Sequence, residues 1–489
     1  MKVIVKTGIA FVLTFLLLIA VAPATVDSGK QDRLSTREIT KSASRLSRSS
    51  AVSGSRMSIE VIDMTSGKVL YSNGENRRLI PASNMKLLTS ATALSLLRPD
   101  YQFRTEVWMD GPIKKGVVKG NLYIKGYGDP SLVDEHLWTI ARDVAYRGIL
   151  QIDGKIIADD SYFDRNQHGV GWGKIGSEAY YAPISALSLN FNTFVVTASP
   201  ANKVGAPPKL FYMAPDKHLK LINRAMTVGG KGKSRIKVLD IKNKVNSYEV
   251  VGTVPVRSKT EEVRRTVGDP ALYTAGSFEA YLISWGVAVS GSIDRGKVPK
   301  GATLLIERES EPLSQIIWDM GKFSNNFIAE QIVKTLCARH GQEGKRTPAS
   351  TACGLKVMEQ FLEKLEIEPG NYTIKDGSGL SRSNRISARQ INKVLVAMYN
   401  DPVLWPEFAA SLAVAGVDGT LEERFINSPL RGKVRAKTGH LTGVNALSGY
   451  LPTARGRMLA FSMIFNDFPG YHSSVEEVEE RILEAFARY

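Results

Sequence analysis

Ser83-Asn84-Met85-Lys86 begins the first long helical pattern of the chain, which follows Pro81 and ends before Pro99. Residues three positions apart share a helix face, so the Lys86 ammonium can reach the Ser83 hydroxyl. A serine hydroxyl becomes a good nucleophile when a base removes its proton, and a lysine with a lowered pKa can be that base. The pair alone is weak evidence, because a capping serine followed by an exposed lysine gives the same pattern.

Two later segments carry residues of related chemistry. Ser324-Asn325-Asn326 precedes a helical stretch, where the hydroxyl can relay a proton and the carboxamide can hold a substrate amide. Taken singly, this segment is more simply explained by a serine at a helix N-cap. Lys437-Thr438-Gly439 enters the strands that end the chain. It offers a positive charge, a hydroxyl and a glycine that a ligand backbone can approach closely.

In this order the three segments resemble the S-x-x-K, S-x-N and K-T-G motifs of penicillin-binding proteins and serine β-lactamases. The gap of 238 positions between Lys86 and Ser324 makes the chain similar, within that group, to the class C penicillin-binding proteins of low molecular mass. These are D-alanyl-D-alanine carboxypeptidases and endopeptidases of the peptidase S13 family, which carry β-rich domains in this gap. The similarity covers about residues 57–489 and includes Gly126–Pro130, Leu187–Asn192 and Asp376–Arg382.

The resemblance implies an α+β fold with a domain like that of serine β-lactamases and penicillin-binding transpeptidases, in which helices flank an antiparallel sheet. The composition agrees, because residues 100–301 contain many short strand patterns separated by Gly, Pro, Asn and Asp. We therefore expect residues 57–99 and 302–489 to form one catalytic domain, with one or two β-rich domains inserted between them. Such an insertion costs little, since loop-closure entropy grows only logarithmically with length.

The resemblance also implies roles for the motif residues. Ser83 is expected to attack the carbonyl between two D-residues of a peptidoglycan stem peptide and to form an acyl-enzyme. Lys86 is the expected base, and the like charge of Lys437 is expected to help keep it neutral. Ser324 is expected to pass a proton to the departing amine, and Asn326 to hold the peptide amide.

Further residues are expected to bind the substrate. Lys437 and Thr438 would hold the carboxylate of the leaving residue. The backbone N–H groups of Ser83 and of His440, which follows Gly439, would form the oxyanion hole. His440 departs from the family pattern, because a small hydroxyl residue is usual at that position.

Arg382 and Asp159 are two candidates for reading the substrate side chain, such as the amine of diaminopimelate. The alternative for Asp159 is a turn or helix-cap carboxylate. No separate glutamate base for deacylation can be placed in the sequence, which favours a peptidase over a β-lactamase. A β-lactamase or related serine esterase nevertheless stays an alternative, as does a non-catalytic scaffold that binds peptidoglycan.

The first 24 residues predict export. Lys2 and Lys6 precede an uncharged, largely apolar run from Thr7 to Ala24, which ends in Ala22-Pro23-Ala24. This pattern is typical of a secretory signal peptide cut after Ala24. An uncleaved membrane anchor is the alternative, because the run approaches the length that spans a bilayer. The Gram-negative periplasm is the expected location, with peripheral or no membrane association of the mature protein.

The segment after the leader, residues 25–56, is polar and rich in Ser and Arg. It is expected to be a tether or a short surface helix, and its composition favours mobility.

The composition is that of an ordinary globular chain of two or three domains, with 489 residues, of which 43% are hydrophobic and 23% charged. The two cysteines, Cys337 and Cys353, are too few for a four-cysteine zinc site, and they leave open either one disulfide or two thiols. The six histidines lack the short paired spacing of a metalloenzyme, so no metal or cofactor is expected.

The charge is unevenly distributed along the chain. The formal net charge is +16, and residues 201–265 hold 15 Lys plus Arg against 5 Asp plus Glu. This region is either a solvated β surface or a patch that attracts an anionic polymer. It lacks a recognisable nucleic-acid-binding motif, so nucleic acid is not an expected partner. The expected partners are peptidoglycan stem peptides and β-lactam antibiotics, and the oligomeric state is left open.

Overall fold

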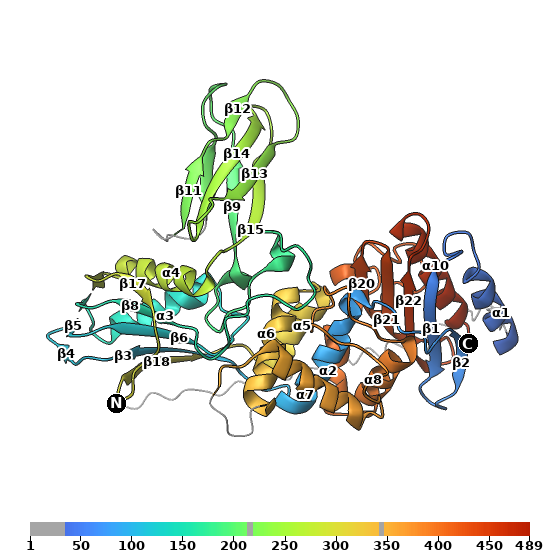
Figure 1. Cartoon of the computed structure of the whole chain (residues 1–489). Helices are drawn as coiled ribbons and strands as arrows, with labels where there is room; N and C mark the ends of the chain where they lie inside the picture. The colour runs from blue at the N-terminus through green and yellow to red at the C-terminus, as the bar shows by residue number, and fades with distance from the viewer. Residues whose placement is uncertain (1–34, 213–218, 342–346) are drawn as a thin grey trace, which may run out of the picture.

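The computed structural model describes residues 35–212, 219–341 and 347–489, so the predicted leader lies outside the described residues. Both ends of the described chain contribute to a six-stranded antiparallel sheet (Figure 1). Its strand order is β19 (Ala413–Val414), β20 (Arg435–Leu441), β21 (Val444–Pro452), β22 (Met458–Asn466), β1 (Arg56–Asp63) and β2 (Val69–Asn73). The first and last parts of the sequence therefore share one sheet.

Helices cover both faces of this sheet, which explains why β21 and β22 are buried along almost their whole length. On one face α8 (Ala388–Asn400) packs against β22 and β1. On the other face α10 (His472–Phe486) packs against β21, and α1 (Thr36–Leu46) packs against α10. Each face thus has its own apolar core.

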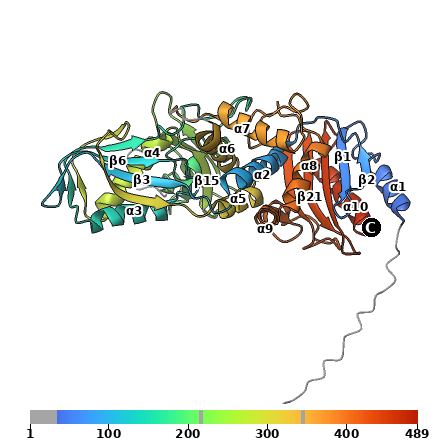
Figure 2. The ribbon, with the colours of Figure 1, turned by 90° about the horizontal axis from the view of Figure 1, so that it is seen from below.

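A layer of helices lies between the six-stranded sheet and the inserted part of the chain (Figure 2). Its members are α2 (Met85–Leu97), α5 (Leu313–Lys322), α6 (Asn326–Leu336), α7 (Thr351–Lys364) and α9 (Trp405–Ser411). Eleven of the thirteen residues of α2 are buried, because α5, α6, α7 and α8 all pack around it. A disulfide joins Cys337, directly after α6, to Cys353 in α7, so the bridge that the sequence left open is present.

The inserted part leaves and re-enters the helical layer at one place. Strands β3 (Arg104–Met109) and β18 (Thr303–Glu309) pair antiparallel, with Arg104 opposite Glu309. They belong to a five-stranded sheet in the order β17 (Ile293–Arg295), β8 (Ile156–Asp159), β6 (Leu122–Gly126), β3 and β18. A small sheet extends it, with β16 (Ala288–Val289), β7 (Gln151–Ile152), β5 (Val117–Val118) and β4 (Ile113–Lys114).

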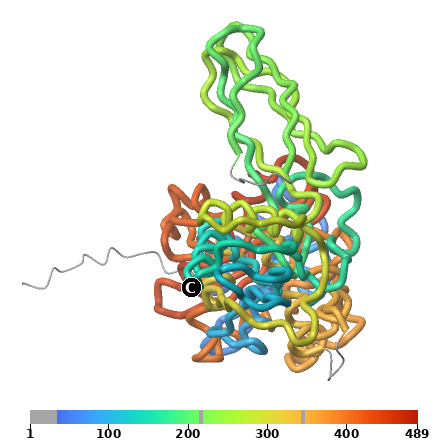
Figure 3. The backbone as a smooth tube through the Cα atoms, turned by 90° about the vertical axis from the view of Figure 1, so that its left-hand side faces the viewer, coloured from blue at the N-terminus to red at the C-terminus, as the bar shows by residue number. Residues whose placement is uncertain are grey.

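A second inserted module projects away from the rest of the molecule (Figures 1 and 3). It has one sheet of β10 (Lys209–Tyr212), β9 (Thr193–Ser199) and β15 (Glu261–Thr266). The other sheet contains β11 (Lys220–Asn223), β14 (Ser247–Pro255), β12 (Met226–Val228) and β13 (Arg235–Asp240). Most of the basic residues of the 201–265 region lie on this module.

The predicted α+β fold is confirmed, and the structure adds helices that the sequence patterns did not predict. The five-stranded sheet carries α3 (Asp134–Tyr146) and α4 (Pro270–Ser284), which pack against each other. Ten of the fifteen residues of α4 are buried, so the helix lacks the apolar stripe by which a surface helix is predicted. Residues 36–46 form a short helix packed on the core, so of the two alternatives for this segment the helix, and not the mobile tether, is confirmed for this stretch.

Candidate active site

Ser83 lies on a single 3-10 turn, η1 (Ala82–Asn84), directly before α2. The preceding Ala82 has a left-handed backbone with φ of 47°, a conformation that non-glycine residues adopt at a cost and that is common at functional sites. Asn84 is fully buried, and its side-chain amide donates to Ser448 Oγ of β21 at 2.8 Å. This bond fixes the turn against the central sheet.

Lys86 stands one helical turn after Ser83 and is 1% exposed. Its Nζ donates to Ser83 Oγ at 3.0 Å, to Asn326 Oδ1 at 2.7 Å and to the Ser378 carbonyl at 2.7 Å. The alternative of a capping serine with an exposed lysine is therefore wrong. Three segments that are distant in the sequence meet at one ammonium group.

Burial sets the protonation of this lysine. Desolvation lowers the pKa of Lys86 to about 7, although the nearby carboxylates of Asp376 and Glu330 act in the opposite direction. Burial also lowers the pKa of Lys437 well below its ordinary value, and repulsion from Lys86 adds to that shift. Both amines thus lose their protons far more readily than lysines in water.

Ser324 and Lys437 form the second half of the cluster. Ser324 lies in the turn between α5 and α6 with a φ of 56°, and Asn325, not Ser324, caps α6 by accepting from Ile328 N. Lys437 Nζ donates to Ser324 Oγ at 3.0 Å and to the Thr438 carbonyl at 3.0 Å. The capping explanation for Ser324 is therefore wrong, and its hydroxyl faces the amine of β20.

The rest of the Lys437-Thr438-Gly439 segment borders η1. A Cβ atom on Gly439 would lie 2.7 Å from the Pro81 carbonyl, so the glycine lets β20 approach the turn that carries Ser83. Thr438 Oγ1 donates to Thr420 Oγ1 at 2.8 Å. The exposed His440 ring stacks on His472 with 3.6 Å between ring centroids, so its side chain turns toward the start of α10.

Two buried carboxylates hold the loop that presents the Ser378 carbonyl to Lys86. Asp376 accepts from the backbone of Gly379 and Ser381 at 2.9 and 2.6 Å and from Trp172 Nε1 at 2.9 Å. Glu330 Oε1 accepts from Gly377 N and Ser378 N at 3.0 and 2.9 Å. Burial and then the neighbouring Asp376 raise the pKa of Glu330 to about 8.

Sequence reasoning missed Glu330 entirely. The sequence pattern could have indicated it, because Glu330 follows Asn326 by four positions and so lies on the same face of α6. An acidic residue inside an otherwise apolar helical stretch indicates a buried partner.

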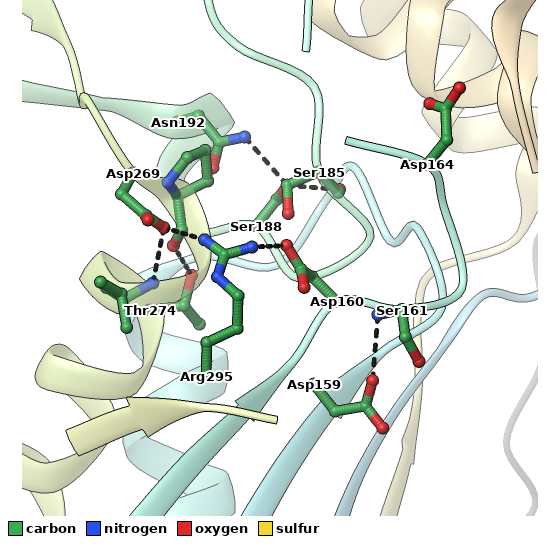
Figure 4. A network of polar contacts seen from close by, with 12 residues as sticks. Asp159, Asp160, Ser161, Asp164, Ser185, Ser188, Asn192, Asp269, Thr274 and Arg295 are labelled. Atoms are coloured by element: carbon green, nitrogen blue, oxygen red, sulfur yellow. Dashed lines mark hydrogen bonds and ion pairs between the residues drawn. The ribbon is translucent and has the colours of Figure 1, made fainter. Parts of the chain in front are cut away.

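The two candidates for side-chain recognition lie in different environments. Arg382 is exposed, and its guanidinium donates to the Thr442 carbonyl at 3.0 Å, next to the end of β20. Asp159 is 1% exposed and accepts from Ser161 N at 2.9 Å (Figure 4). It also accepts from Val298 N at 2.8 Å. These bonds match the turn-carboxylate alternative for Asp159, and we assign it no contact with substrate.

The insertion contributes to the surroundings of the cluster. Asn326 Nδ2 donates to the Tyr180 carbonyl at 3.2 Å. A cavity of about 470 Å³ adjoins Ser324 and Asn326, and the insertion supplies Tyr180, Phe191 and Arg264 to its wall. Within the three described ranges, no group of three or more His, Cys, Asp and Glu side chains is arranged to hold a metal ion.

A serine hydroxyl hydrogen-bonded to a buried lysine, with an asparagine and a second buried lysine beside them, on an antiparallel sheet flanked by helices, defines a serine acyltransferase of the penicillin-recognising class. The family model of the D-Ala-D-Ala carboxypeptidase 3 (S13) family matches residues 40–487. The chain belongs to this family. It is a serine D,D-peptidase of the penicillin-binding type that acts through an acyl-enzyme, as the family resemblance predicted.

Individual relatives agree with this assignment. The chain is 37% identical over 437 residues to a D-alanyl-D-alanine carboxypeptidase of Actinomadura sp., covering 86% of this chain and 79% of the relative. It is 27% identical over 423 residues to the D-alanyl-D-alanine carboxypeptidase DacB of Haemophilus influenzae, covering 85% and 86%. The crystal structure of penicillin binding protein 4 from H. influenzae matches with a TM-score of 0.80 at 25% identity, covering 91% and 99%.

Proposed function

We propose that Ser83 is the nucleophile of this peptidase and that Lys86 is the base that activates it. The observation that carries the proposal is the position of Lys86 Nζ, 3.0 Å from Ser83 Oγ and bonded on other sides to Asn326 Oδ1 and the Ser378 carbonyl. A neutral amine has two protons and one lone pair. When those protons point to Asn326 and Ser378, the lone pair faces Ser83 and accepts its proton as Oγ attacks the carbonyl.

Proton transfer to the departing amine is assigned to Ser324. Its hydroxyl accepts a hydrogen bond from Lys437 Nζ, so the proton that Ser324 gives away can be replaced from that amine. Asn326, whose Nδ2 points toward Tyr180, is assigned to hold an amide of the stem peptide. Lys86 thus keeps the proton that it takes from Ser83, while the leaving amine receives the proton of Ser324, which Lys437 replaces.

Binding of the leaving residue is assigned to β20. Lys437 and Thr438 receive its carboxylate, which favours the charged form of the lysine on binding. The backbone N–H groups of Ser83 and His440 form the oxyanion hole, which the close approach of Gly439 to Pro81 supports. Removal of one such donor typically costs about 3 kcal/mol of transition-state stabilisation.

The domain division follows from the sheets. We propose that residues 57–99 and 302–489 form one catalytic domain, since β1 and β2 share a sheet with β20 to β22. Residues 100–301 form the inserted domains, and the pairing of β3 with β18 supports this boundary.

Export is proposed on two grounds. The leader has the pattern of a signal peptide, and the Cys337–Cys353 disulfide fits an oxidising compartment. The Gram-negative periplasm stays a prediction. In the described ranges, no helix has both the length and the apolar character needed to span a bilayer.

The proposed substrates are D-alanyl-D-alanine ends and D-alanyl-diaminopimelate cross-links of peptidoglycan, with β-lactams acylating the same serine. Arg382, whose guanidinium donates to the Thr442 carbonyl beside the end of β20, is assigned to the substrate side chain. Digestion of purified linear and cross-linked muropeptides, with products identified by mass, tests this assignment. We expect loss of terminal D-alanine and conversion of dimers to monomers, both abolished by Ser83→Ala. Rapid hydrolysis of penicillin without action on either peptide would contradict it and indicate a β-lactamase.

A further inference from the structure

The first described helix, α1, has two chemically distinct faces. Ile39, Ala43 and Leu46 are buried against the core beside α10. On the outer side lie four exposed cations, Arg37, Lys41, Arg45 and Arg48. Their spacing of four, four and three positions places them in one stripe along the helix and its following turn.

These four cations are free to meet an external anion. Within residues 35–212, 219–341 and 347–489, no salt bridge to a carboxylate is formed by any of them. The acidic residue of this helix, Glu38, is already engaged, because it forms a capping box with Ser35. The stripe is therefore a net positive surface that folding leaves without an internal counter-charge.

A surface groove of about 890 Å³ runs beside the stripe. Lys41 and Arg45 line it from α1 and Arg48 from the turn that follows, and Arg481, which pairs with Glu477, lines it from α10. The hydroxyls of Ser42 and Ser49 also line it, and Glu38 lies at its edge. Several cations beside hydroxyl donors are the chemistry that binds phosphate groups.

The position of α1 in the chain indicates which phosphate-bearing partner lies near this groove. The apolar run Thr7–Ala24 ends 11 residues before α1, which is at most about 40 Å of extended chain. Before the predicted cut after Ala24, a leader that engages the membrane therefore holds α1 close to the lipid surface. In the fold, α1 lies at the end of the molecule opposite the insertion (Figures 1 and 2).

We propose that the cationic stripe of α1 docks the enzyme on a membrane surface rich in anionic phospholipid. A planar layer of phosphates is complementary to a straight row of cations on an exposed helix, and each cation near such a surface adds to the affinity. The docking surface is separate from the catalytic cluster, so it sets where the enzyme works without taking part in the reaction.

The test uses the protein isolated after expression of the full chain with its own leader. Binding is measured by co-sedimentation with vesicles of neutral phosphatidylcholine and with vesicles that also contain phosphatidylglycerol. The neutral vesicles report any contribution of a retained apolar leader. The variant R37Q/K41Q/R45Q/R48Q removes the stripe, and K231Q/K233Q/R257Q/K259Q removes four exposed cations from the projecting module as a matched control.

We expect the wild type to bind the anionic vesicles at least tenfold more tightly than the neutral ones, with binding that weakens as salt is added. The stripe variant is expected to lose this difference, and the control variant to change by less than threefold. Unchanged rates of acylation by penicillin show that both variants fold. Equal losses in both variants, an unchanged stripe variant, or binding of the wild type to isolated cell wall in place of anionic vesicles would overturn the proposal.

Discussion

Lys86 lies where a helix, a loop carbonyl and a carboxamide converge, and this geometry decides its chemistry. Two of its three hydrogen bonds go to acceptors that cannot donate in return, the Ser378 carbonyl and Asn326 Oδ1. The third partner, Ser83, can act as donor or acceptor. The surroundings therefore orient a neutral amine toward the serine, and burial brings the pKa of Lys86 to about 7.

The rate of acylation is expected to follow this protonation. Because the folded-state pKa of Lys86 is about 7, the lysine is protonated below that pH and its lone pair is lost. The second-order rate constant for acylation by penicillin should fall about tenfold per pH unit below pH 7 and level off above it. Stopped-flow measurements between pH 5.5 and 8.5 check this. A flat profile across that range would show that Lys86 is not the base.

At the scale of elements, the loop after Asp376 packs against the turn that carries Ser83. Gly379 has a φ of 86°, and a Cβ atom there would lie 1.8 Å from the Ala82 carbonyl. The loop therefore packs directly against the backbone of η1. It contacts the turn that carries Ser83 and also presents the Ser378 carbonyl that accepts from Lys86.

Gly379→Ala is expected to disrupt this contact, and Gly370→Ala is its matched control. Gly370 has a similar φ of 83°, but a Cβ atom there would have no heavy atom within 4 Å, so its substitution costs only the backbone strain, about 1–2 kcal/mol. Gly379→Ala should lower the free energy of unfolding by at least about 2 kcal/mol more than Gly370→Ala does. It should also reduce the rate of acylation by penicillin at least about 100-fold. Thermal unfolding and acylation rates of both variants provide the measurements. Equal behaviour of the two variants would refute the role of close packing.

The sequence predicted the secondary structure around the motifs better than it predicted which charged groups act on Lys86. The motif Ser83 to Lys86 could be predicted because both residues lie on one helical turn. The carboxylates of Glu330 and Asp376 act on Lys86 across distant segments, which no local pattern shows. Lys437 was expected to help keep Lys86 neutral; desolvation is the largest cause of the lowered pKa of Lys86, and repulsion between the two amines is a smaller cause of the lowered pKa of Lys437.

At the scale of the whole molecule, a polar network joins the parts of the insertion to each other. Arg295 of β17 forms ion pairs with Asp160, after β8, and with Asp269, the N-cap of α4 (Figure 4). The same loop reaches the catalytic helices, where Asp164 accepts from the buried Lys334 of α6 at 2.6 Å. The insertion is thus fastened to the helical layer by charge as well as by packing.

Arg295→Met is expected to loosen the insertion. The substitution leaves the carboxylates of Asp160 and Asp269, 13% and 21% exposed, without their cation. This loss should lower the free energy of unfolding by about 3 kcal/mol. Hydrogen exchange of α4 amides should accelerate by about 100-fold if they exchange through this opening. Lys155→Met is the control, because its pair with Asp294 is about half exposed and worth at most about 1 kcal/mol. Equal exchange in both variants would show that the network does not hold the insertion.

The position of the insertion could be predicted for a physical reason, whereas the contacts of single residues within it could not. When two motifs of one site are separated by a long stretch of sequence, that stretch leaves the common core and returns to it. The pairing of Arg104 with Glu309 brings its two ends together. Asp159 accepts from Val298 N, far along the sequence, so no local pattern could decide between a substrate contact and a turn carboxylate for this residue. The helix α4 was missed because it is apolar on most sides.

The central claim is that Ser83 is the residue that becomes acylated. The most direct measurement is the mass of the protein and of its proteolytic peptides after reaction with benzylpenicillin, for the wild type and for Ser83→Ala. We predict one adduct per wild-type chain, on the peptide that contains Ser83, and none on a folded Ser83→Ala protein. An adduct that persists in Ser83→Ala, or one located on Ser324, would contradict the account.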